Sequence, residues 1–474
     1  MINLKFYSIL PDTMRKKFLI VALLLSSFVN IAAFAQAPAD SLMIRKIYDE
    51  ALSHGAGYTW LRYLSEEIGG RLSGSPQAAA AVEWSRQVMD SLGLDSVYLQ
   101  QVMVPHWMRG KKEVGKIISA GHLATKEVGL CALGGSVATP KNGITAAVVE
   151  VQNFQELRSL GRNTVAGKIV FFNRPMDPTL INTFSAYAGA VNQRGAGVVE
   201  AAKLGAVAVI VRSMSLFSED YAHTGGLRYA PDVREIPGAA ISTNHADMLS
   251  SLLKREPDTR FFLEMHCRNL PEVISYNVIG ELRGTTNPEE IIAIGGHLDS
   301  WDIGDGAHDD GAGCVQSIEV LRIFQQLKIK PKRTIRVVMF MNEENGLRGG
   351  LQYALKAKEN QENHIVAIES DAGGFSPRGF GIDASDDKIR RIKEWKPLFL
   401  PYGIYQIGKG GGGADISPLR DEKIALIGLM PDSQRYFTLH HAETDTFDKV
   451  NKRELELGAA AMTSLVYLFS IHGL

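Results

Sequence analysis

One apolar stretch that ends in polar residues decides the fold class: Ile291-Ile292-Ala293-Ile294-Gly295-Gly296-His297-Leu298-Asp299-Ser300. An unbroken apolar run bounded by glycines is typical of a strand buried on both faces, and a helical pattern over 311–327 follows it. The same alternation of apolar strand and helix recurs as far as residue 470. It predicts an α/β fold whose parallel or mostly parallel sheet is covered by helices on both faces. Functional residues in such sheets gather at the carboxyl ends of the strands.

Polar residues follow this strand directly. His297 comes after the apolar run, and Asp299 lies where its carboxylate can reach the second ring nitrogen of His297. Metal-bound histidines usually have such a partner. Asp309 opens the next helix and could bridge two cations, although spacing alone leaves its neighbours His308 and Asp310 as alternative ligands or helix caps.

Adjacent acids follow the next predicted strand, 334–341. Glu343 and Glu344 would repel each other there unless a cation or a proton intervened. The pair divides naturally into one metal ligand and one general base. Asp371 follows a further predicted strand, 365–368, so acids recur at a second strand end. This recurrence favours a metal site over a solvated acidic turn.

A late histidine pair supplies the remaining candidates, in Leu439-His440-His441-Ala442-Glu443-Thr444-Asp445-Thr446. One histidine could be a fifth ligand, and Asp445 could orient it. Two histidines and three carboxylates suit two zinc ions that lie roughly 3.5–4 Å apart and share one carboxylate. Such a pair activates a water molecule and polarises a carbonyl, while a neighbouring glutamate accepts the proton. The sequence has no G-x-S-x-G, H-E-x-x-H or phosphate-binding-loop motif.

These segments resemble the co-catalytic zinc exopeptidase family, which includes bacterial leucyl aminopeptidases, glutamate carboxypeptidase II and carboxypeptidase Q. The resemblance implies Asp309 as the bridging ligand and Glu343 as the general base, with Asp299 as a catalytic partner of His297. It selects His441 over His440 because of the spacing to Asp445. The implied metal ligands are His297, Asp309, Glu344, Asp371 and His441.

The resemblance is closest to the carboxypeptidase Q subgroup. It rests on His297-Leu298-Asp299-Ser300-Trp301-Asp302, His223-Thr224-Gly225 and His440-His441. The family fold is an α/β sandwich with a mixed sheet covered by helices. The resemblance also implies a β-rich protease-associated domain inserted at residues 117–268. Residues 36–116 and 269–474 would then form the zinc peptidase domain.

Composition sets outer limits on the function. A chain of 474 residues is long enough for two or three domains. The 51 lysines and arginines nearly cancel the 52 acids, so no basic surface for nucleic acid or membrane is expected. Three cysteines are too few for a disulfide framework. A pair between Cys131 and Cys267, or three buried thiols including Cys314, would both fit.

The N-terminus has the pattern of a secretory signal peptide over residues 1–35. Met14-Arg15-Lys16-Lys17 is positively charged, residues 18–25 are apolar, and Ala33-Phe34-Ala35 forms a cleavage site before Gln36. The pattern predicts a secreted or periplasmic protein with no membrane span after cleavage. Translation could start at Met1 or at Met14.

The expected function is hydrolysis of dipeptides or short peptides by a carboxypeptidase or dipeptidase with two zinc ions per chain. An aminopeptidase of the same family is the alternative, and a glutaminyl cyclase or a non-catalytic surface binding protein is more distant. Lys409, Arg435 and Tyr436 lie near predicted site loops and could hold a substrate carboxylate. Asp415, after the glycine run 410–413, is a further candidate for substrate contact. The expected partner is a small peptide, and a homodimer is left open.

Overall fold

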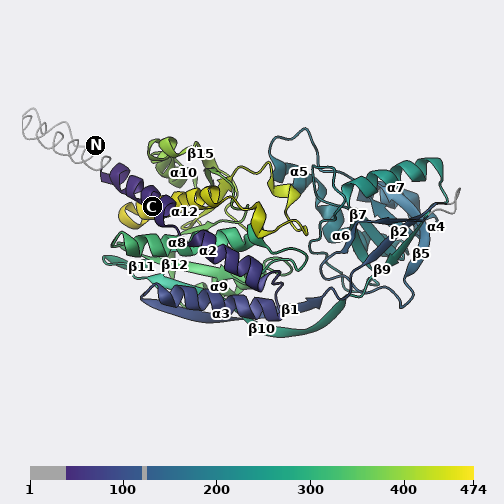
Figure 1. The fold of residues 1–474 in the computed structure, drawn as a ribbon, viewed down its shortest axis with the longest axis horizontal. Coiled ribbons are helices and arrows are strands. Elements are labelled where there is room, and N and C mark those ends of the chain that lie inside the picture. Colours follow the sequence, from purple (N-terminus) through teal and green to yellow (C-terminus); the bar gives the residue numbers. More distant parts are fainter. Residues whose placement is uncertain (1–38, 120–124) are drawn as a thin grey trace, which may run out of the picture.

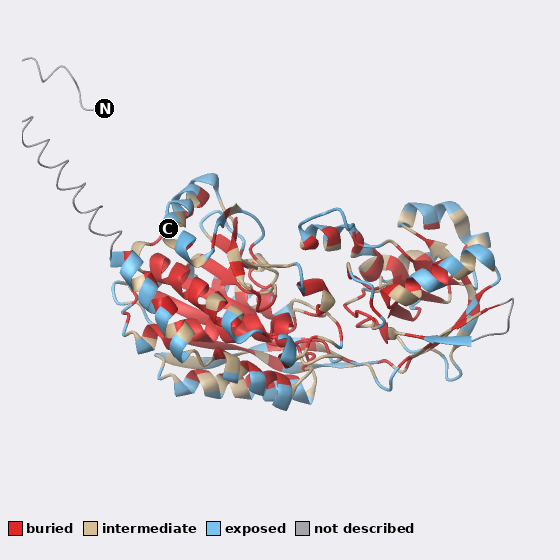
Figure 2. Cartoon of the chain, turned by 45° about the horizontal axis from the view of Figure 1, so that its top comes forward, coloured by how far each residue is buried: buried red, intermediate tan, exposed pale blue. Residues whose placement is uncertain are grey.

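The computed structural model describes residues 39–119 and 125–474. The predicted signal peptide lies outside the described residues. Figure 1 shows two lobes side by side along the long axis, each built on its own sheet, with β1 and β10 running between them. Buried residues gather in the interior of each lobe (Figure 2).

The first lobe contains a mixed eight-stranded sheet. Its four central strands, β12, β11, β13 and β16, are parallel, which confirms the predicted parallel arrangement there. Antiparallel strands extend the sheet at both ends, as the resemblance implied. The strand order is β1 (Ser96–Met108), β10 (Arg268–Leu282), β12 (Arg333–Phe340), β11 (Asn287–His297), β13 (Asn363–Glu369), β16 (Ala425–Pro431), β14 (Pro377–Asp383) and β15 (Gln406–Lys409).

Helices cover both faces of this sheet. One face packs against α3, α8 and α12, and the other against α9. The larger helices of the lobe are a helix over the described residues 39–54, α2 (Gly57–Arg62), α3 (Pro76–Ser91), α8 (Ala312–Gln326), α9 (Arg348–Glu359), α10 (Asp386–Lys393), α11 (Lys396–Phe399) and α12 (Lys452–His472). Short helical turns add η1 (Tyr63–Ile68), η2 (Ala307–Gly311), η3 (Leu400–Tyr402), η4 (Ser417–Leu419), η5 (Tyr436–Thr438) and η6 (Phe447–Lys449).

Helix α12 is the one helix among the described residues that is long and apolar enough to span a membrane. Its most apolar window has a mean hydropathy of 1.3, and 83% of that window is buried. It packs on α8, whose residues are buried along almost the whole helix. An apolar helix enclosed in this way is a core helix of a globular lobe.

The second lobe carries the sheet formed by residues 114–264. Its strand order is β3 (Thr125–Val128), β2 (Val114–Ile118), β9 (Arg260–Glu264), β5 (Ile144–Val151), β6 (Ile169–Phe172), β7 (Ala208–Arg212), β8 (Gly238–Ile241) and β4 (Leu130–Ala132). Four helices accompany it, so this region is more helical than its β-rich sequence suggested: α4 (Phe154–Val165), α5 (Thr183–Ala190), α6 (Asn192–Lys203) and α7 (Thr243–Arg255). The sheet begins at Val114, slightly before the expected boundary at 117. All three cysteines are buried and free.

Candidate metal centre and active site

Three adjacent parallel strands bring the candidate residues to one edge of the first sheet. His297 is the last residue of β11, Glu343 and Glu344 follow β12, and Asp371 follows β13. Strand β11 lies between β12 and β13, with Gly295 in register with Val338 and with Glu369. These strand ends therefore meet at one edge, as expected for an α/β sheet.

The first group of possible ligands contains His297, Asp309 and Asp371. The Nε2 atom of His297 lies 3.2 Å from Asp309 Oδ1 and 3.5 Å from Asp371 Oδ1. The Nδ1 atom lies 2.9 Å from the main-chain carbonyl of Asp299, to which it can donate. This contact leaves the lone pair of Nε2 facing the two carboxylates, as a metal ligand requires.

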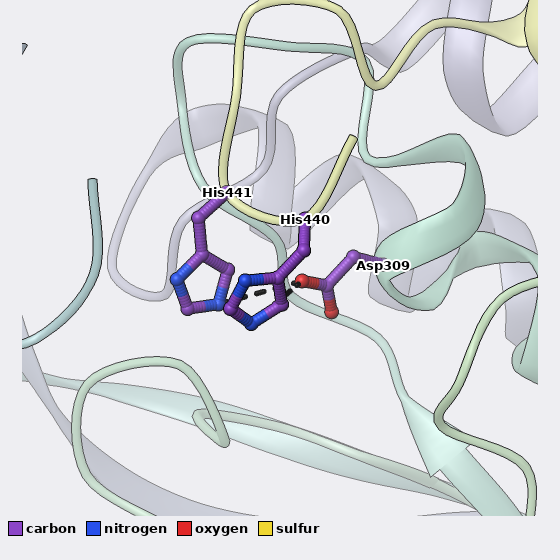
Figure 3. Close-up of side chains that lie close together, drawn as sticks. All are labelled: Asp309, His440 and His441. Atoms are coloured by element: carbon purple, nitrogen blue, oxygen red, sulfur yellow. Dashed lines mark ion pairs between the residues drawn. The ribbon is translucent and has the colours of Figure 1, made fainter. Parts of the chain in front are cut away.

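The second group contains Glu344, Asp309 and His441. The Nε2 atom of His441 lies 3.1 Å from Glu344 Oε2 and 3.4 Å from Asp309 Oδ2. Asp309 thus offers one oxygen to each group, which is the geometry of a bridging ligand. His440 stacks on His441, with ring centroids 3.6 Å apart (Figure 3). Its Nε2 atom is 4.0 Å from Asp309 Oδ2, farther than that of His441.

The donor set fits metal cations. Both carboxylate oxygens of Glu344 and Oδ2 of Asp309 are buried and have no hydrogen-bond partner in the described chain. Burial and the charge of Asp309 raise the pKa of Glu344 well above its ordinary value. Carboxylates crowded in this way repel one another, and divalent cations between them relieve both the repulsion and the missing contacts.

Asp310 and His308 have structural roles, which resolves an ambiguity of the sequence. The Asp310 carboxylate accepts hydrogen bonds from the main-chain N–H groups of His297 and Gly313, both at 3.0 Å. Gly296 makes room for it, since a Cβ there would lie 2.3 Å from Asp310 Oδ2.

The His308 ring stacks on Phe375 and accepts a hydrogen bond from Gly374 N–H. Asp310 therefore caps the start of α8, and the Asp309 carboxylate faces His297 and His441.

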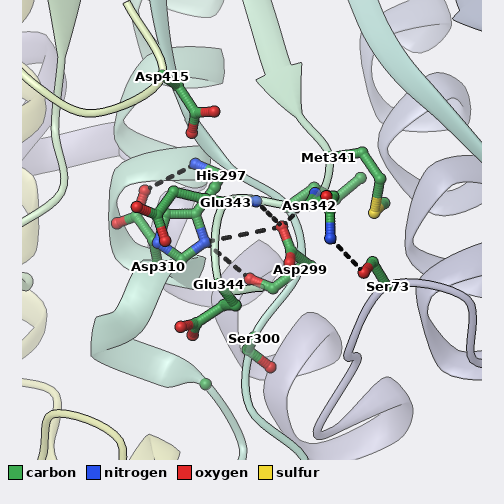
Figure 4. Close-up of polar contacts among 12 residues, drawn as sticks. Ser73, His297, Asp299, Ser300, Asp310, Met341, Asn342, Glu343, Glu344 and Asp415 are labelled. Carbon is green, nitrogen blue, oxygen red and sulfur yellow. Dashed lines mark hydrogen bonds and ion pairs between the residues drawn. The ribbon is translucent and has the colours of Figure 1, made fainter. Parts of the chain in front are cut away.

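The carboxylates of Asp299 and Asp445 hold main-chain N–H groups, and it is the main-chain carbonyl of Asp299, rather than its carboxylate, that accepts from the His297 ring. The Asp299 carboxylate is 4.0 Å from the His297 ring and accepts N–H bonds from Asn342 at 2.7 Å and Glu343 at 3.1 Å (Figure 4). Asp445 accepts the N–H groups of residues 308 and 309 at 2.8 and 3.0 Å. Main-chain donors satisfy both oxygens of Asp445 and Oδ1 of Asp299, while Oδ2 of Asp299 has no partner among the described residues. The ligand loops are thus fixed through their backbone.

Arg71 and Ser73 support the same loops and were not recognised in the sequence, where residues 69–75 looked like a simple turn. The fully buried guanidinium of Arg71 donates to the carbonyl oxygens of Leu298, Asp305 and Gly306 at 2.6–2.9 Å. Ser73 accepts a hydrogen bond of 2.7 Å from the Asn342 amide. A buried arginine paired only with carbonyl groups has no pattern in a single sequence that could reveal it.

The four candidate substrate residues lie in different surroundings. Tyr436 lines the metal cavity, whereas Arg435 is half exposed, pairs with Glu454 at 2.7 Å and covers the Phe375 ring. Lys409 borders a second cavity next to the metal site. Asp415 is completely buried, and neither of its carboxylate oxygens has a partner among the described residues. Tyr436 alone of the four borders the metal cavity.

The metal cavity has a volume of about 350 Å³, and the second lobe forms one of its walls. Helix α5 contributes Tyr187 and helix α6 contributes Arg194. A strand-like contact joins the lobes directly, because His223 bridges to Ala442 and Thr224 N–H donates to the His441 carbonyl at 2.9 Å. The loop that carries His441 is therefore held by the second lobe.

The fold and this donor set define a metallopeptidase, and the chain belongs to peptidase family M28, which matches residues 277–466. Carboxypeptidase Q of Bos taurus is 35% identical over 430 residues, covering 91% of this chain and 88% of that protein. A peptidase M28 precursor from Shewanella amazonensis SB2B superposes with a TM-score of 0.86 at 34% identity, covering 91% of this chain and 97% of that one. An aminopeptidase from Aneurinibacillus sp. strain AM-1 shares the fold, with a TM-score of 0.61, 22% identity and coverage of 90% and 95%.

These relationships confirm the predicted family, the α/β fold and a zinc-dependent metallopeptidase activity. They favour neither a glutaminyl cyclase nor a binding protein without catalytic activity. Peptides are accordingly the substrate class.

Proposed function

We propose that the chain is an exported carboxypeptidase or dipeptidase that uses two zinc ions. One ion would be held by His297 and Asp371, the other by Glu344 and His441, with Asp309 between them. The donor atoms around Asp309 support this pairing because its two oxygens face different histidines. Zinc bound here supplies a Lewis acid that polarises the scissile carbonyl and makes water more acidic.

Glu343 is the proposed general base. It borders the metal cavity, and its main chain is fixed by Asp299. Burial among neighbouring carboxylates raises the pKa of Glu343 to about 8. Cations bound beside it favour the ionised form, so the carboxylate can accept a proton from water and deliver it to the leaving amine.

Arg194 carries the proposal that a free carboxyl terminus is recognised. Its side chain is only 8% exposed and borders the metal cavity. The Arg194 guanidinium donates one hydrogen bond to the Tyr187 hydroxyl at 2.7 Å. The Nε–H of Arg194 has no partner, and no carboxylate of the described residues pairs with Arg194. A buried guanidinium in this state is a strong receptor for a carboxylate.

The position of Arg194 relative to the proposed metal ligands also supports recognition of the carboxyl terminus of the substrate. One Nη atom lies 3.3 Å from Nδ1 of His441, so the guanidinium stands beside the Glu344–His441 group. A carboxylate bound there would place the last peptide bond of the substrate over the metals. Lys409 and Arg435, the cations favoured by the sequence, do not border this cavity.

The test compares free dipeptides with the corresponding dipeptide amides. We expect the wild type to prefer the free acid, and Arg194→Gln to lower its kcat/KM about 10- to 100-fold while the amide changes little. Arg194→Lys keeps the charge and should retain part of the preference, and zinc content checks that the metals stay bound. Equal cleavage of acids and amides by the wild type would instead identify an aminopeptidase, the alternative within this fold.

The remaining assignments of the sequence extend this proposal. The signal-peptide pattern supports export with cleavage near Ala35. Residues between β1 and β10 form the second sheet, which supports a protease-associated domain inserted into the peptidase domain. Met108 and Arg268 are register partners, so the insertion would leave and re-enter the first sheet at one point.

A further inference from the structure

A second, larger cavity adjoins the metal cavity. Its volume is about 760 Å³, and the two cavities share Asp371 and Phe184. Its walls are the ends of β15 and β16, the glycine run 410–413, and the segment of the second lobe that leads into α5. The space therefore begins at a proposed metal ligand and extends away from it between the lobes.

The glycine run forms a fixed wall rather than a free loop. Main-chain N–H groups of Ala414 and Ile416 donate to the buried Glu369 carboxylate at 3.0 and 2.9 Å, which ties the run to the end of β13. Within the described chain, the N–H groups of Gly411 and Gly412 have no acceptor. An extended peptide lying along this wall would offer its carbonyl groups to such donors.

The remaining wall combines apolar and polar residues, and one of its cations has no ion pair with a described residue. Leu429, Met430 and Pro431 contribute apolar surface. Arg378 is paired with Asp432 at 3.3 Å, but Lys409 forms no ion pair with any described residue. This lining suits an apolar or acidic side chain and disfavours a basic one.

The metal cavity is lined by both ligand groups, and the larger cavity joins it at Asp371. Arg194 stands beside the Glu344–His441 group, whereas the larger cavity opens at Asp371, which belongs to the His297 group. A peptide with its carboxyl terminus at Arg194 would cross Asp309 and run toward Asp371. The part of the substrate on the N-terminal side of the scissile bond would then enter the larger cavity.

We propose that this cavity binds the N-terminal portion of peptides longer than two residues, with a preference for an apolar or acidic residue before the scissile bond. The inference rests on the proposed carboxypeptidase function. A dipeptide would leave most of the larger cavity empty, so the enzyme is expected to remove the C-terminal residue from tripeptides and N-acetylated dipeptides as well.

The experiment uses the full-length, zinc-loaded enzyme and substrates that share one C-terminal residue. Dipeptides, N-acetyl dipeptides and tripeptides are compared, with Phe, Glu or Lys before the scissile bond. A Cβ at Gly411 would meet nothing within 4 Å, and its backbone is not in the left-handed region, so Gly411→Leu fills space without strain. Gly189→Leu, at an exposed and equally open position on α5, is the matched control.

We expect the wild type to cleave the extended substrates and Gly411→Leu to lower the tripeptide-to-dipeptide ratio of kcat/KM about tenfold or more. Gly189→Leu should leave this ratio unchanged. Lys409→Glu should reverse the preference for Glu over Lys before the scissile bond.

The inference would be overturned if the wild type cleaved neither tripeptides nor N-acetyl dipeptides. It would also be overturned if neither Gly411→Leu nor Lys409→Glu changed the relative kcat/KM values of these substrates. Efficient cleavage of dipeptide amides would refute the carboxypeptidase proposal itself, independently of these ratios.

Discussion

At the scale of single residues, the site depends on side chains that satisfy main-chain groups as much as on those that face the metals. Asp299, Asp310 and Asp445 accept hydrogen bonds from main-chain N–H groups of the ligand loops, Asp299 through Oδ1 alone. This division accounts for acids at the site that do not face the proposed metal positions. Each supporting acid fixes the backbone from which a ligand projects, which is how supporting residues orient ligands in metal sites generally.

Replacement of Glu343 by Gln is expected to abolish most hydrolysis without removing the metals. The amide cannot accept a proton, whereas the proposed ligands and their supporting bonds remain. We expect kcat to fall about 10²- to 10⁴-fold. Steady-state kinetics together with zinc content per chain would check this result. Near-normal turnover would mean that another group serves as the base.

Replacement of Arg71 by Leu is expected to destabilise the fold and weaken zinc binding. Three carbonyl groups of the 298–306 loop would lose their buried donor, which should cost about 3 kcal/mol or more of unfolding free energy. Arg86→Leu removes a partly exposed arginine of α3 and serves as the control, with a much smaller expected change. Urea unfolding would measure both variants, and equal effects would contradict a supporting role of Arg71.

At the scale of elements, strand β13 connects the site to a buried polar group at its other end. His364 lies near the start of β13, and its Nε2 atom is 2.7 Å from the hydroxyl of Tyr353 in α9. Arg336 of β12 donates to the same hydroxyl at 3.2 Å, which leaves the hydroxyl hydrogen free to point at His364. His364 Nε2 can accept that hydrogen only if the ring is neutral. Burial and the charge of Arg336 lower the pKa of His364 to about 3.

This histidine should make the first lobe sensitive to acid. Its folded pKa lies below the ordinary value of 6.5, so the unfolded chain binds the extra proton between pH 6.5 and about 3. The stability contributed by the neutral ring is complete above pH 6.5 and declines as the pH falls through this window. Linkage gives a loss of about 2 kcal/mol between about pH 7.5 and pH 5.

His364→Asn isolates this contribution. Denaturant unfolding of the wild type and the variant at both pH values should show that the variant loses about 2 kcal/mol less on acidification. Because other groups titrate equally in both proteins, the difference between them reports on His364. An identical pH dependence would show that folding leaves the pKa of His364 unchanged.

At the scale of the whole molecule, the two lobes complete one site. The second lobe contributes Arg194 and holds the loop of His441 through Thr224. Trp301 packs against the second lobe so closely that a Cβ at Gly134 would lie 1.8 Å from its ring. The position of the second lobe therefore helps to set the shape of the metal cavity.

Removal of residues 109–267 should separate metal binding from substrate recognition. Met108 and Arg268 face each other across β1 and β10, so a two-residue Asn-Gly turn can join them as a hairpin. We expect a folded chain that binds zinc, more weakly than the wild type, and that no longer prefers free acids over amides because Arg194 is missing. Zinc titration and the acid-to-amide ratio would test this. An insoluble or metal-free product would show that the second lobe is required for the first to fold.

The sequence by itself determined the features that depend on local pattern. Apolar runs followed by polar residues predicted the central parallel strands, because strands buried on both faces are nearly continuous apolar runs. The same pattern placed His297, Glu343, Glu344 and Asp371 at strand ends. The long outer strands β1 and β10 escaped prediction because polar and apolar residues mix along them, and their exposure depends on the sheet edge.

The tertiary structure decided everything that depends on which distant segments meet. Adjacent candidates such as Asp309 and Asp310 have the same chemistry, and only the fold turns one carboxylate toward His297 and the other toward main-chain N–H groups. Arg71 and Arg194 have no local pattern, because the partners of Arg71 lie far away in the chain and the Nε–H of Arg194 has no partner among the described residues. A side chain's role follows from the charges and hydrogen-bonding groups that folding places around it, and no spacing within one segment contains that information.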